Sequence, residues 1–178
     1  MSAGDVIYRP LASGDAEAIA RVQTTSWEET YRGLIPDVVI DRMVSPEGFP
    51  ARWRARLSGE EEMLARTTVA EIEGEGGSRE MVGFVSYGAG RFDEHRCPGE
   101  IWALYLVQAA QGRGIGRRLV EHALEELERA ALRPATVRVL ADNPSREFYR
   151  HVGGVEIDRR QCHIPEAPHL DEVTLRYD

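Results

Sequence analysis

Two hydrophobic periods alternate along this chain. Short apolar or alternating runs predict β-strands, and apolar residues that recur every three or four positions predict helices. We expect strands over residues 6–11, 63–72, 81–89, 100–107, 136–140, 155–164 and 172–177. We expect helices over residues 15–31, 37–43, 46–57 and 115–132, and a short helix that begins at Asn143–Pro144. This order of elements predicts a mixed α/β fold.

The helix expected over residues 115–132 has the clearest pattern. Ile115, Leu119 and Ala123 lie on one apolar stripe, and arginine and glutamate side chains cover most of the remaining positions. The segment before it, residues 100–107, is strongly apolar and aromatic, which is typical of a central strand buried on both faces. The two elements predict a strand–loop–helix unit in the middle of the fold.

Composition narrows the class of protein. A chain of 178 residues is expected to form one domain, residues 1–178, with its own core. No apolar run approaches ~20 residues and no signal-peptide pattern is visible, so we expect a cytoplasmic protein without a membrane helix. The net charge of −8 argues against nucleic acid as a partner. Cys97 and Cys162 are too few for a metal cluster, and we expect no metal site.

A glycine-rich run, Gln-Gly-Arg-Gly-Ile-Gly over residues 111–116, lies between the central strand and the long helix. Glycines at such a junction let backbone N–H groups converge on an anion, and the positive end of the helix adds to the attraction. The chain has no lysine, since all 22 basic side chains are arginine, which excludes a P-loop lysine and Schiff-base chemistry. The glycine spacing also fails the dinucleotide fingerprint G-x-G-x-x-G. We therefore expect a phosphate site of another kind.

The spacing Q-x-x-G-x-G of this run resembles the acyl-CoA pyrophosphate loop of the GNAT superfamily of N-acetyltransferases. Two more segments carry the resemblance: residues 26–36, which resemble the first-helix segment of bacterial members, and residues 140–149 followed by Gly153. The resemblance covers nearly the whole chain. It implies a central, mixed, mostly antiparallel, splayed sheet of six to seven strands, flanked by four to five helices. It also implies acetyl-CoA as cosubstrate.

Several positions correspond to coenzyme contacts in that family. The resemblance implies that the main chain at Leu104 and Leu106 pairs with the pantetheine arm as an added strand would. The residues implied at the pyrophosphate are Gly112, Arg113, Gly114, Ile115, Gly116 and Arg117, through their N–H groups, with Gln111 either contacting the coenzyme or ordering the loop. Asn143, the single asparagine in the sequence, is implied to contact pantetheine or a water, and it also fits a helix cap.

Two side chains are candidates for acid–base chemistry. An alkyl ammonium must lose a proton before it attacks a thioester, so a base or a water chain leading to one is needed. Glu100 opens the central strand, where some members of the family carry a catalytic carboxylate. Tyr149 matches the tyrosine that protonates the departing thiolate in this family. Trp27 and Tyr31 either line the acceptor pocket or belong to the core.

We expect an N-acetyltransferase that moves an acetyl group from acetyl-CoA to a primary amine by direct transfer in a ternary complex. A small-molecule acceptor is favoured, because residues 36–57 are numerous enough to cover a peptide groove. The acidic composition would suit a cationic amine. A protein or peptide N-acetyltransferase is the alternative, and a non-catalytic acyl-CoA-binding module is another, against which Tyr149 argues. The oligomeric state stays open, with a homodimer as one option.

Overall fold

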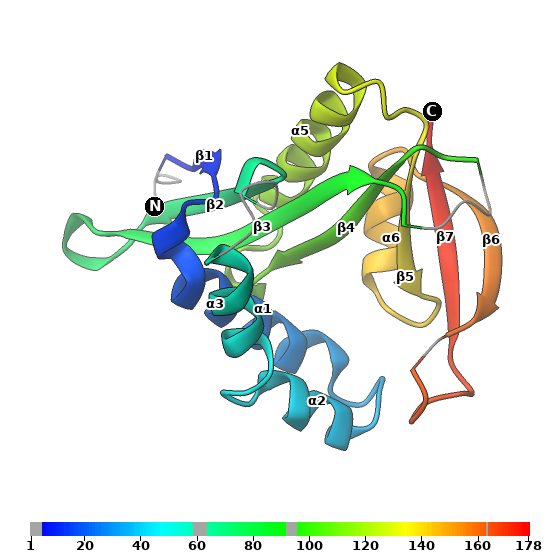
Figure 1. Cartoon of the computed structure of the whole chain (residues 1–178), viewed down its shortest axis with the longest axis horizontal. Coiled ribbons are helices and arrows are strands. Elements are labelled where there is room, and N and C mark those ends of the chain that lie inside the picture. The colour runs from blue at the N-terminus through cyan, green and yellow to red at the C-terminus, as the bar shows by residue number, and fades with distance from the viewer. Residues whose placement is uncertain (1–4, 59–63, 92–95, 163) are drawn as a thin grey trace.

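The computed structural model describes residues 5–58, 64–91, 96–162 and 164–178. Over these ranges, strands form one open sheet of seven in the order β1-β2-β3-β4-β5-β7-β6 (Figure 1). The strands are β1 (Ile7–Pro10), β2 (Thr67–Glu73), β3 (Arg79–Ala89), β4 (Gly99–Leu106), β5 (Ala135–Leu140), β6 (Val155–Gln161) and β7 (Asp171–Tyr177). Neighbouring strands are antiparallel except for β4 and β5, which are parallel. The expected mixed, mostly antiparallel sheet is confirmed.

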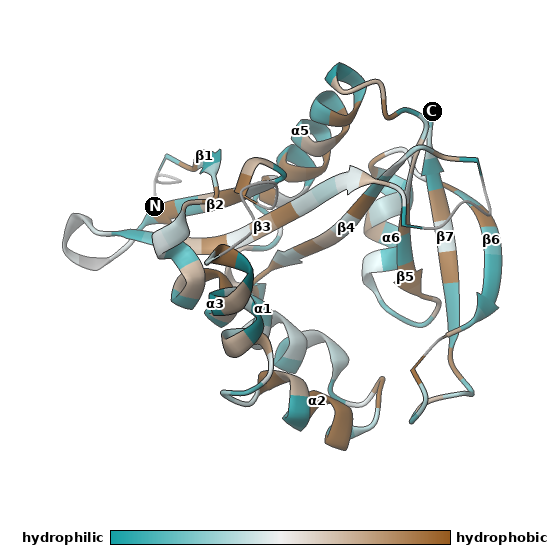
Figure 2. Cartoon of the chain, viewed as in Figure 1, coloured by the Kyte–Doolittle hydropathy of each residue, from teal (hydrophilic) through white to brown (hydrophobic). Residues whose placement is uncertain are grey.

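Helices cover both faces of this sheet. In the described ranges they are α1 (Ala16–Tyr31), α2 (Asp37–Val44), α3 (Phe49–Leu57), α5 (Ile115–Arg129) and α6 (Ser145–His151). On one face, α1 and α3 form a cluster with β2 and β3 that includes Phe84. On the other face, α5 and α6 form a cluster with the central strands that includes Val85. Figure 2 shows hydrophobic residues along β3 and β4, whereas the edge strand β6 is mostly hydrophilic.

Some expected boundaries are wrong by several residues. The strand expected over 63–72 begins at Thr67, because residues 64–66 form helical and turn structure, and residue 63 lies outside the described ranges. The helix expected over 46–57 begins at Phe49, after a turn over residues 46–48. The helix expected over 115–132 ends at Arg129, because Ala131 adopts a left-handed conformation with φ of 56°. The strand expected over 155–164 ends at Gln161.

The surroundings of β4 change halfway along its length. Its first three residues, Gly99 to Ile101, are buried and pair with Ala135 to Val137 of β5. Beyond Ile101 the β4–β5 ladder ends, the two strands diverge, and residues 102–106 are only half-buried (Figure 1). The expectation of a strand buried on both faces is therefore wrong for the second half of β4. The resulting gap in the sheet gives the splay that the family resemblance implied.

A glycine allows the close approach where β4 and β5 begin. A Cβ added at Gly99 would lie 2.1 Å from the carbonyl oxygen of Leu132, in the connection that leads into β5. No other residue could occupy this position without moving that connection. The start of the parallel pair is therefore fixed by backbone packing.

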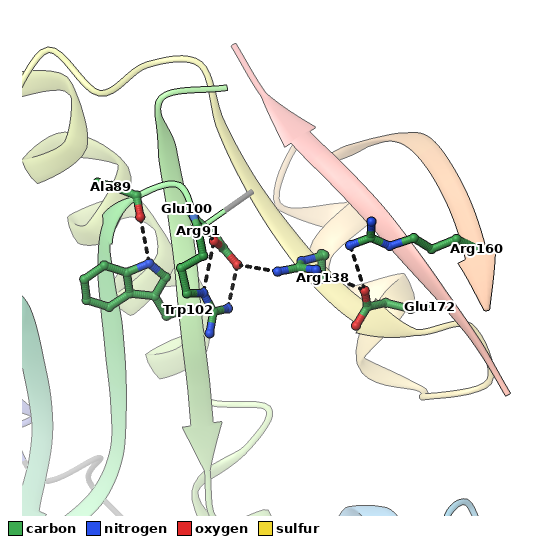
Figure 3. Close-up of polar contacts among 7 residues, drawn as sticks. All are labelled: Ala89, Arg91, Glu100, Trp102, Arg138, Arg160 and Glu172. Atoms are coloured by element: carbon green, nitrogen blue, oxygen red, sulfur yellow. Dashed lines mark hydrogen bonds and ion pairs between the residues drawn. The ribbon is translucent and has the colours of Figure 1, made fainter. Parts of the chain in front are cut away.

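A chain of ion pairs crosses the sheet at the same level (Figure 3). Glu100 of β4 accepts hydrogen bonds from Arg91, at 2.6 Å from Nη2 and 3.1 Å from Nε, and from the Arg91 backbone N–H at 2.9 Å. Arg138 of β5 lies 3.4 Å from Glu100 and 3.4 Å from Glu172 of β7, and Arg160 of β6 lies 3.6 Å from Glu172. These contacts connect β4 to the three strands beyond the splay.

The Glu100 carboxylate is 2% exposed, so its charge needs this compensation. Burial acts to raise the pKa of Glu100, but the hydrogen bonds from Arg91 and the positive charges of Arg91 and Arg138 outweigh it. The pKa of Glu100 therefore lies below its ordinary value. The side chain is held as an ionised partner within the sheet.

Replacing this carboxylate by an amide, Glu100→Gln, should lower the free energy of unfolding by about 1–3 kcal/mol at neutral pH, since charge-assisted hydrogen bonds to a buried group are lost. Because the folded-state pKa of Glu100 is lowered, its contribution is complete above the ordinary glutamate pKa of about 4.3. It disappears as the pH falls through the lower folded-state value. Urea unfolding of both proteins at neutral pH and at a pH well below the ordinary glutamate value of about 4.3 measures the difference.

The control is Glu128→Gln, on the exposed side of α5, which should change stability by less than about 0.5 kcal/mol. A Glu100 variant as stable as the wild type at neutral pH, or a difference that persists unchanged in acid, would contradict the assigned role of the ion pairs.

Candidate functional site

A cavity of about 470 Å³ occupies the gap between β4 and β5. Residues 102–106 of β4 form one wall and residues 137–139 of β5 the other. The start of α5 with its preceding loop, α6 with the residues on either side of it, and the end of α1 complete the lining. The cavity is therefore bordered by strand edges that no longer pair with each other, with two helix N-termini beside it.

The glycine loop closes one end of this cavity. Gly112 and Gly114 have φ angles of 72° and 81°, which non-glycine residues rarely adopt, and both line the cavity. The first backbone bond of α5 runs from the Arg118 N–H to the Gly114 carbonyl at 3.1 Å. Within the described chain no backbone carbonyl accepts from the amides of residues 112–117. These amides, at the positive end of a helix, form a site suited to an anion.

Neighbouring side chains hold the loop in place. Gln111 donates from Nε2 to the Leu106 carbonyl oxygen at 3.1 Å, so it links the loop to the end of β4. Ile115 is buried in the core. A Cβ added at Gly116 would come within 3.3 Å of the Phe148 ring of α6, so the missing side chain allows α5 and α6 to approach. Phe148 was not singled out from the sequence, where it resembled ordinary core.

The arginines of the loop separate into two groups. Arg117 lines the cavity and lies 3.5 Å from the His151 carbonyl oxygen. Arg113 is exposed and is not among the lining residues. Arg118 lies 3.7 Å from Glu121 and from Glu125 on its own helix. Arg117 is therefore the loop arginine placed at the cavity itself.

Tyr149 of α6 faces the cavity from the wall that includes β5. It is 6% exposed, packs against Phe148 with ring centroids 5.3 Å apart, and accepts a hydrogen bond at its backbone oxygen from the Tyr177 hydroxyl. Burial, followed by the neighbouring Tyr177 and Tyr105, raises the pKa of the Tyr149 phenol well above its ordinary value. The phenol therefore stays protonated at neutral pH.

Asn143 lies two residues before α6 and also lines the cavity. Its Oδ1 accepts a hydrogen bond at 2.8 Å from the N–H of Ser145, the first residue of α6, whereas the N-cap position itself is occupied by Pro144 and not by Asn143 as the sequence predicted. Burial raises the pKa of Tyr31 well above its ordinary value, and a side-chain hydrogen bond with Asn143 offsets part of this effect. Asn143 thus connects α6 to the end of α1 across the cavity.

The two aromatic candidates on α1 have different surroundings. Tyr31 lines the cavity, together with Ser26 and Thr30. Trp27 lines neither this cavity nor the second one described below. Its ring lies 4.9 Å from that of Tyr31, and its Nε1 donates to the Tyr105 hydroxyl at 3.0 Å. Trp27 supports residues that reach the cavities without reaching them itself.

The structure does not bring Glu100 together with Tyr149 at the cavity. Glu100 is not among the lining residues of either cavity, and both of its oxygens accept hydrogen bonds from arginine. Its lowered pKa also makes it a weak base. Across the described ranges, neither cavity is lined by an aspartate or a glutamate.

A second cavity, of about 350 Å³, lies beside β4 toward α1 and α3. It shares Trp102, Ala103 and Tyr105 with the first, so the cavities adjoin at the second half of β4. Trp102 is the extra residue of a bulge, because Ile101 and Ala103 pair with consecutive residues of β3. Trp102 and Tyr105 were not singled out from the sequence; two aromatic residues within an otherwise aliphatic strand were the available signal.

Among the described residues no group of three histidine, cysteine, aspartate or glutamate side chains is arranged to hold a metal ion. The helices in those same ranges include none with the length and apolar character needed to cross a membrane.

Comparison with known proteins extends these observations. The sequence matches the Acetyltransferase (GNAT) family over residues 24–153. It is 32% identical over 145 residues to the uncharacterised N-acetyltransferase YuaI of Bacillus subtilis (strain 168), which covers 82% of this chain and 78% of the relative.

Solved structures show the same fold at lower identity. The PaiA N-acetyltransferase from Thermoplasma acidophilum, in complex with coenzyme A, superposes with a TM-score of 0.73 at 18% identity, covering 97% of this chain and 99% of that chain. The yncA protein from Salmonella typhimurium, with its cofactor acetyl-CoA, gives a TM-score of 0.68 at 21% identity, covering 98% and 94%. The splayed sheet, the glycine loop and the match over residues 24–153 agree, and this chain belongs to the GNAT acetyltransferase family.

Proposed function

We propose that this protein transfers the acetyl group of acetyl-CoA to the primary amine of a small molecule, by direct attack in a ternary complex. The observation that carries the proposal is the cavity between β4 and β5, which meets unpaired backbone amides at residues 112–117 and the Tyr149 phenol. The proposed anion site, the free edge of β4 and the proposed proton donor therefore all border the same cavity.

The chain has groups that fit each part of the coenzyme. The amides of residues 112–117 would hold the pyrophosphate, with Arg117 beside it. The edge of β4 at Leu104 and Leu106 would pair with the amides of the pantetheine arm, as an added strand does. Asn143 would contact the same arm from just before α6. Bound in this way, the coenzyme supplies an activated acetyl thioester.

Tyr149 would act on the departing sulfur. The amine nitrogen forms the new C–N bond, the C–S bond breaks, and the thiolate takes the phenol proton, which solvent later restores. Burial raises the pKa of the phenol, but it also raises the pKa of a thiolate in the same space. A backbone N–H of β4 would face the oxyanion of the tetrahedral intermediate.

The amine proton would leave through water. No carboxylate of the described chain lines either cavity, and Glu100 is occupied by two arginines. We therefore assign Glu100 to holding the sheet together, and we assign deprotonation of the amine to solvent, the alternative to a base side chain.

A contact between distant segments supports a small acceptor over a peptide. Val39 and Ile40 of α2 form an apolar cluster with Ala167 and Leu170, in the connection between β6 and β7. Arg42 of α2 also lies 2.7 Å from Glu166 in the same connection. The two segments that would flank a peptide groove therefore touch each other.

A screen for thiol release from acetyl-CoA tests the proposed activity, with small amines in one set and peptides with free N-termini in another. We expect turnover with small amines and little with peptides. Peptides as the better substrates would favour a protein N-acetyltransferase. Acetyl-CoA binding without thiol release in any set would favour a non-catalytic binding module.

The variant Tyr149→Phe keeps the ring and removes the proton donor. We expect kcat to fall by about 100-fold or more, as for loss of a general acid, while the KM for acetyl-CoA changes by less than about 2-fold. Steady-state kinetics measures both. The control is Tyr8→Phe, at a tyrosine that lines neither cavity. An unchanged kcat in the Tyr149 variant would remove the phenol from the acid role.

The variant Gly114→Ala places a side chain at a φ of 81°. Because no atom lies within 4 Å of the added Cβ, the strain falls on the backbone that presents the amides. We expect acetyl-CoA affinity to fall by about 10-fold or more, as for one or two lost charge-assisted hydrogen bonds. Isothermal titration calorimetry measures the affinity.

The matched control for this loop is Gly76→Ala, in the β2–β3 hairpin. Gly76 has a φ of 69° and open space around the added Cβ, so the local strain is similar. It should leave acetyl-CoA affinity unchanged. Equal affinities in both variants and the wild type would contradict the assignment of the loop to the pyrophosphate.

A further inference from the structure

The second cavity has a lining that is positively charged and aromatic. Arg52 and Arg56 of α3 and Arg91 at the end of β3 contribute guanidinium groups, while Trp53 and Trp102 contribute indole rings. None of the described aspartates or glutamates lines it. The positive charge of this lining is opposite in sign to the net charge of the whole chain, which is −8.

The arginines of this cavity differ in whether an acidic side chain of the described chain already pairs with them. Arg91 is paired with Glu100 at 2.6 Å (Figure 3). Arg52 and Arg56 form no ion pair with any acidic residue of the described chain. Arg56 lies 5.5 Å from the centre of the Trp53 ring. By contrast Arg54, on the same helix, pairs with Glu17 at 2.8 Å and lies outside the cavity.

Arg52 and Arg56 line one cavity and have no acidic partner among the described residues, so this lining is suited to an anion. Guanidinium groups bind carboxylates through paired, charge-assisted hydrogen bonds. The indole rings offer apolar surface for the remainder of a small molecule. Gln23 and Ser86 add polar groups to the lining, and the Gln23 side chain already accepts a hydrogen bond from Trp53 Nε1 at 2.7 Å.

The position of this cavity relates it to the proposed reaction. Trp102, Ala103 and Tyr105 line both cavities, so a ligand in the second lies next to the space proposed for the thioester. The Trp102 indole is fixed there, because its Nε1 donates to the Ala89 carbonyl at 3.0 Å (Figure 3) and its ring packs where a Cβ at Gly88 would be 2.4 Å away.

We infer that the acetyl acceptor is a primary amine that carries a carboxylate, such as an amino acid, whose carboxylate binds Arg52 and Arg56. This inference rests on the proposed acetyl transfer and names its substrate class. The same arginines would disfavour an ammonium nearby and so lower the pKa of the bound amine, which favours the neutral form that attacks. The acidic composition suggested a cationic acceptor, but the local charge at the cavity has the opposite sign.

The test compares L-amino acids with their carboxamides as acceptors, with kcat/KM expressed per neutral amine, because the amide removes the anionic group and also lowers the pKa of the amine. With acetyl-CoA and wild-type protein, we expect kcat/KM to be about 10-fold or more higher for the acids, as for a charge-assisted contact. In the double variant R52Q/R56Q, the KM for the acids should rise by a similar factor and kcat should change less. The preference for acids over amides should then largely disappear.

The matched control is Arg54→Gln, on the same helix but paired with Glu17 outside the cavity. It should keep the preference for acids. Equal or faster acetylation of the carboxamides or of polyamines by the wild type would overturn the inference and leave the proposed acetyl transfer intact. An undiminished preference in R52Q/R56Q would overturn it as well.

A binding measurement separates this inference from the proposed function. Trp53 and Trp102 line the cavity, so their fluorescence reports occupancy without turnover. We expect N-acetyl-L-alanine to change it in the wild type and not in R52Q/R56Q, and N-acetyl-L-alaninamide, which lacks the carboxylate, to bind more weakly. If wild-type protein acetylates no amine yet shows this response, the transfer proposal fails and the anion site stands. No response to either compound would overturn the anion site.

Discussion

The site depends on one interruption in the sheet: β4 and β5 pair only at Gly99–Ile101 and then separate. Backbone N–H and C=O groups inside a protein require partners, and a strand that loses its neighbour leaves them facing an open space. In this chain the space is a cavity of about 470 Å³ with the amides of residues 112–117 at one end. A ligand that has both amide groups and phosphates satisfies both features, which is why the splay and the glycine loop belong to one site.

Where two strands separate, other contacts must hold the two parts of the sheet together, and the ion pairs do this. Arg138 contacts Glu100 on β4 and Glu172 on β7, so charges connect the strands on both sides of the splay. The lowered pKa of Glu100 is a consequence of this arrangement. The strand on which a catalytic base was expected therefore carries a carboxylate held by two arginines, and the proposed mechanism assigns the acid–base steps to Tyr149, the backbone and water.

The sequence correctly predicted the features that depend on a local residue pattern or on the conformations open to glycine. The stripe beginning at Ile115 predicted α5 and the glycine run predicted its open N-terminus, and these features together with the segment at Asn143 led to the correct family. It could not predict what depends on distant partners. The ion pairs of Glu100 require Arg91, which follows strand β3, and Arg138, which lies on strand β5. A local sequence pattern does not show that these side chains meet.

The acceptor side was hidden for the same reason. Arg52 and Arg56 resemble ordinary exposed helix positions, and the helix pattern gives no sign that they line a cavity together with Trp102. The net charge of the chain pointed toward a cationic partner, since an average over the whole surface does not show the local sign at a pocket. Only the packing of α3 beside β4 brings these arginines to the edge of the splay.

Backbone amide hydrogen exchange with and without acetyl-CoA tests the central claim most directly, that free main-chain groups at the splay hold the coenzyme. The account predicts that acetyl-CoA slows exchange at residues 112–117 and at amides of β4 beyond Ile101, and leaves β2 and β6 unchanged. Unaltered exchange at both sets of amides under saturating acetyl-CoA, or protection confined to another part of the chain, would contradict it.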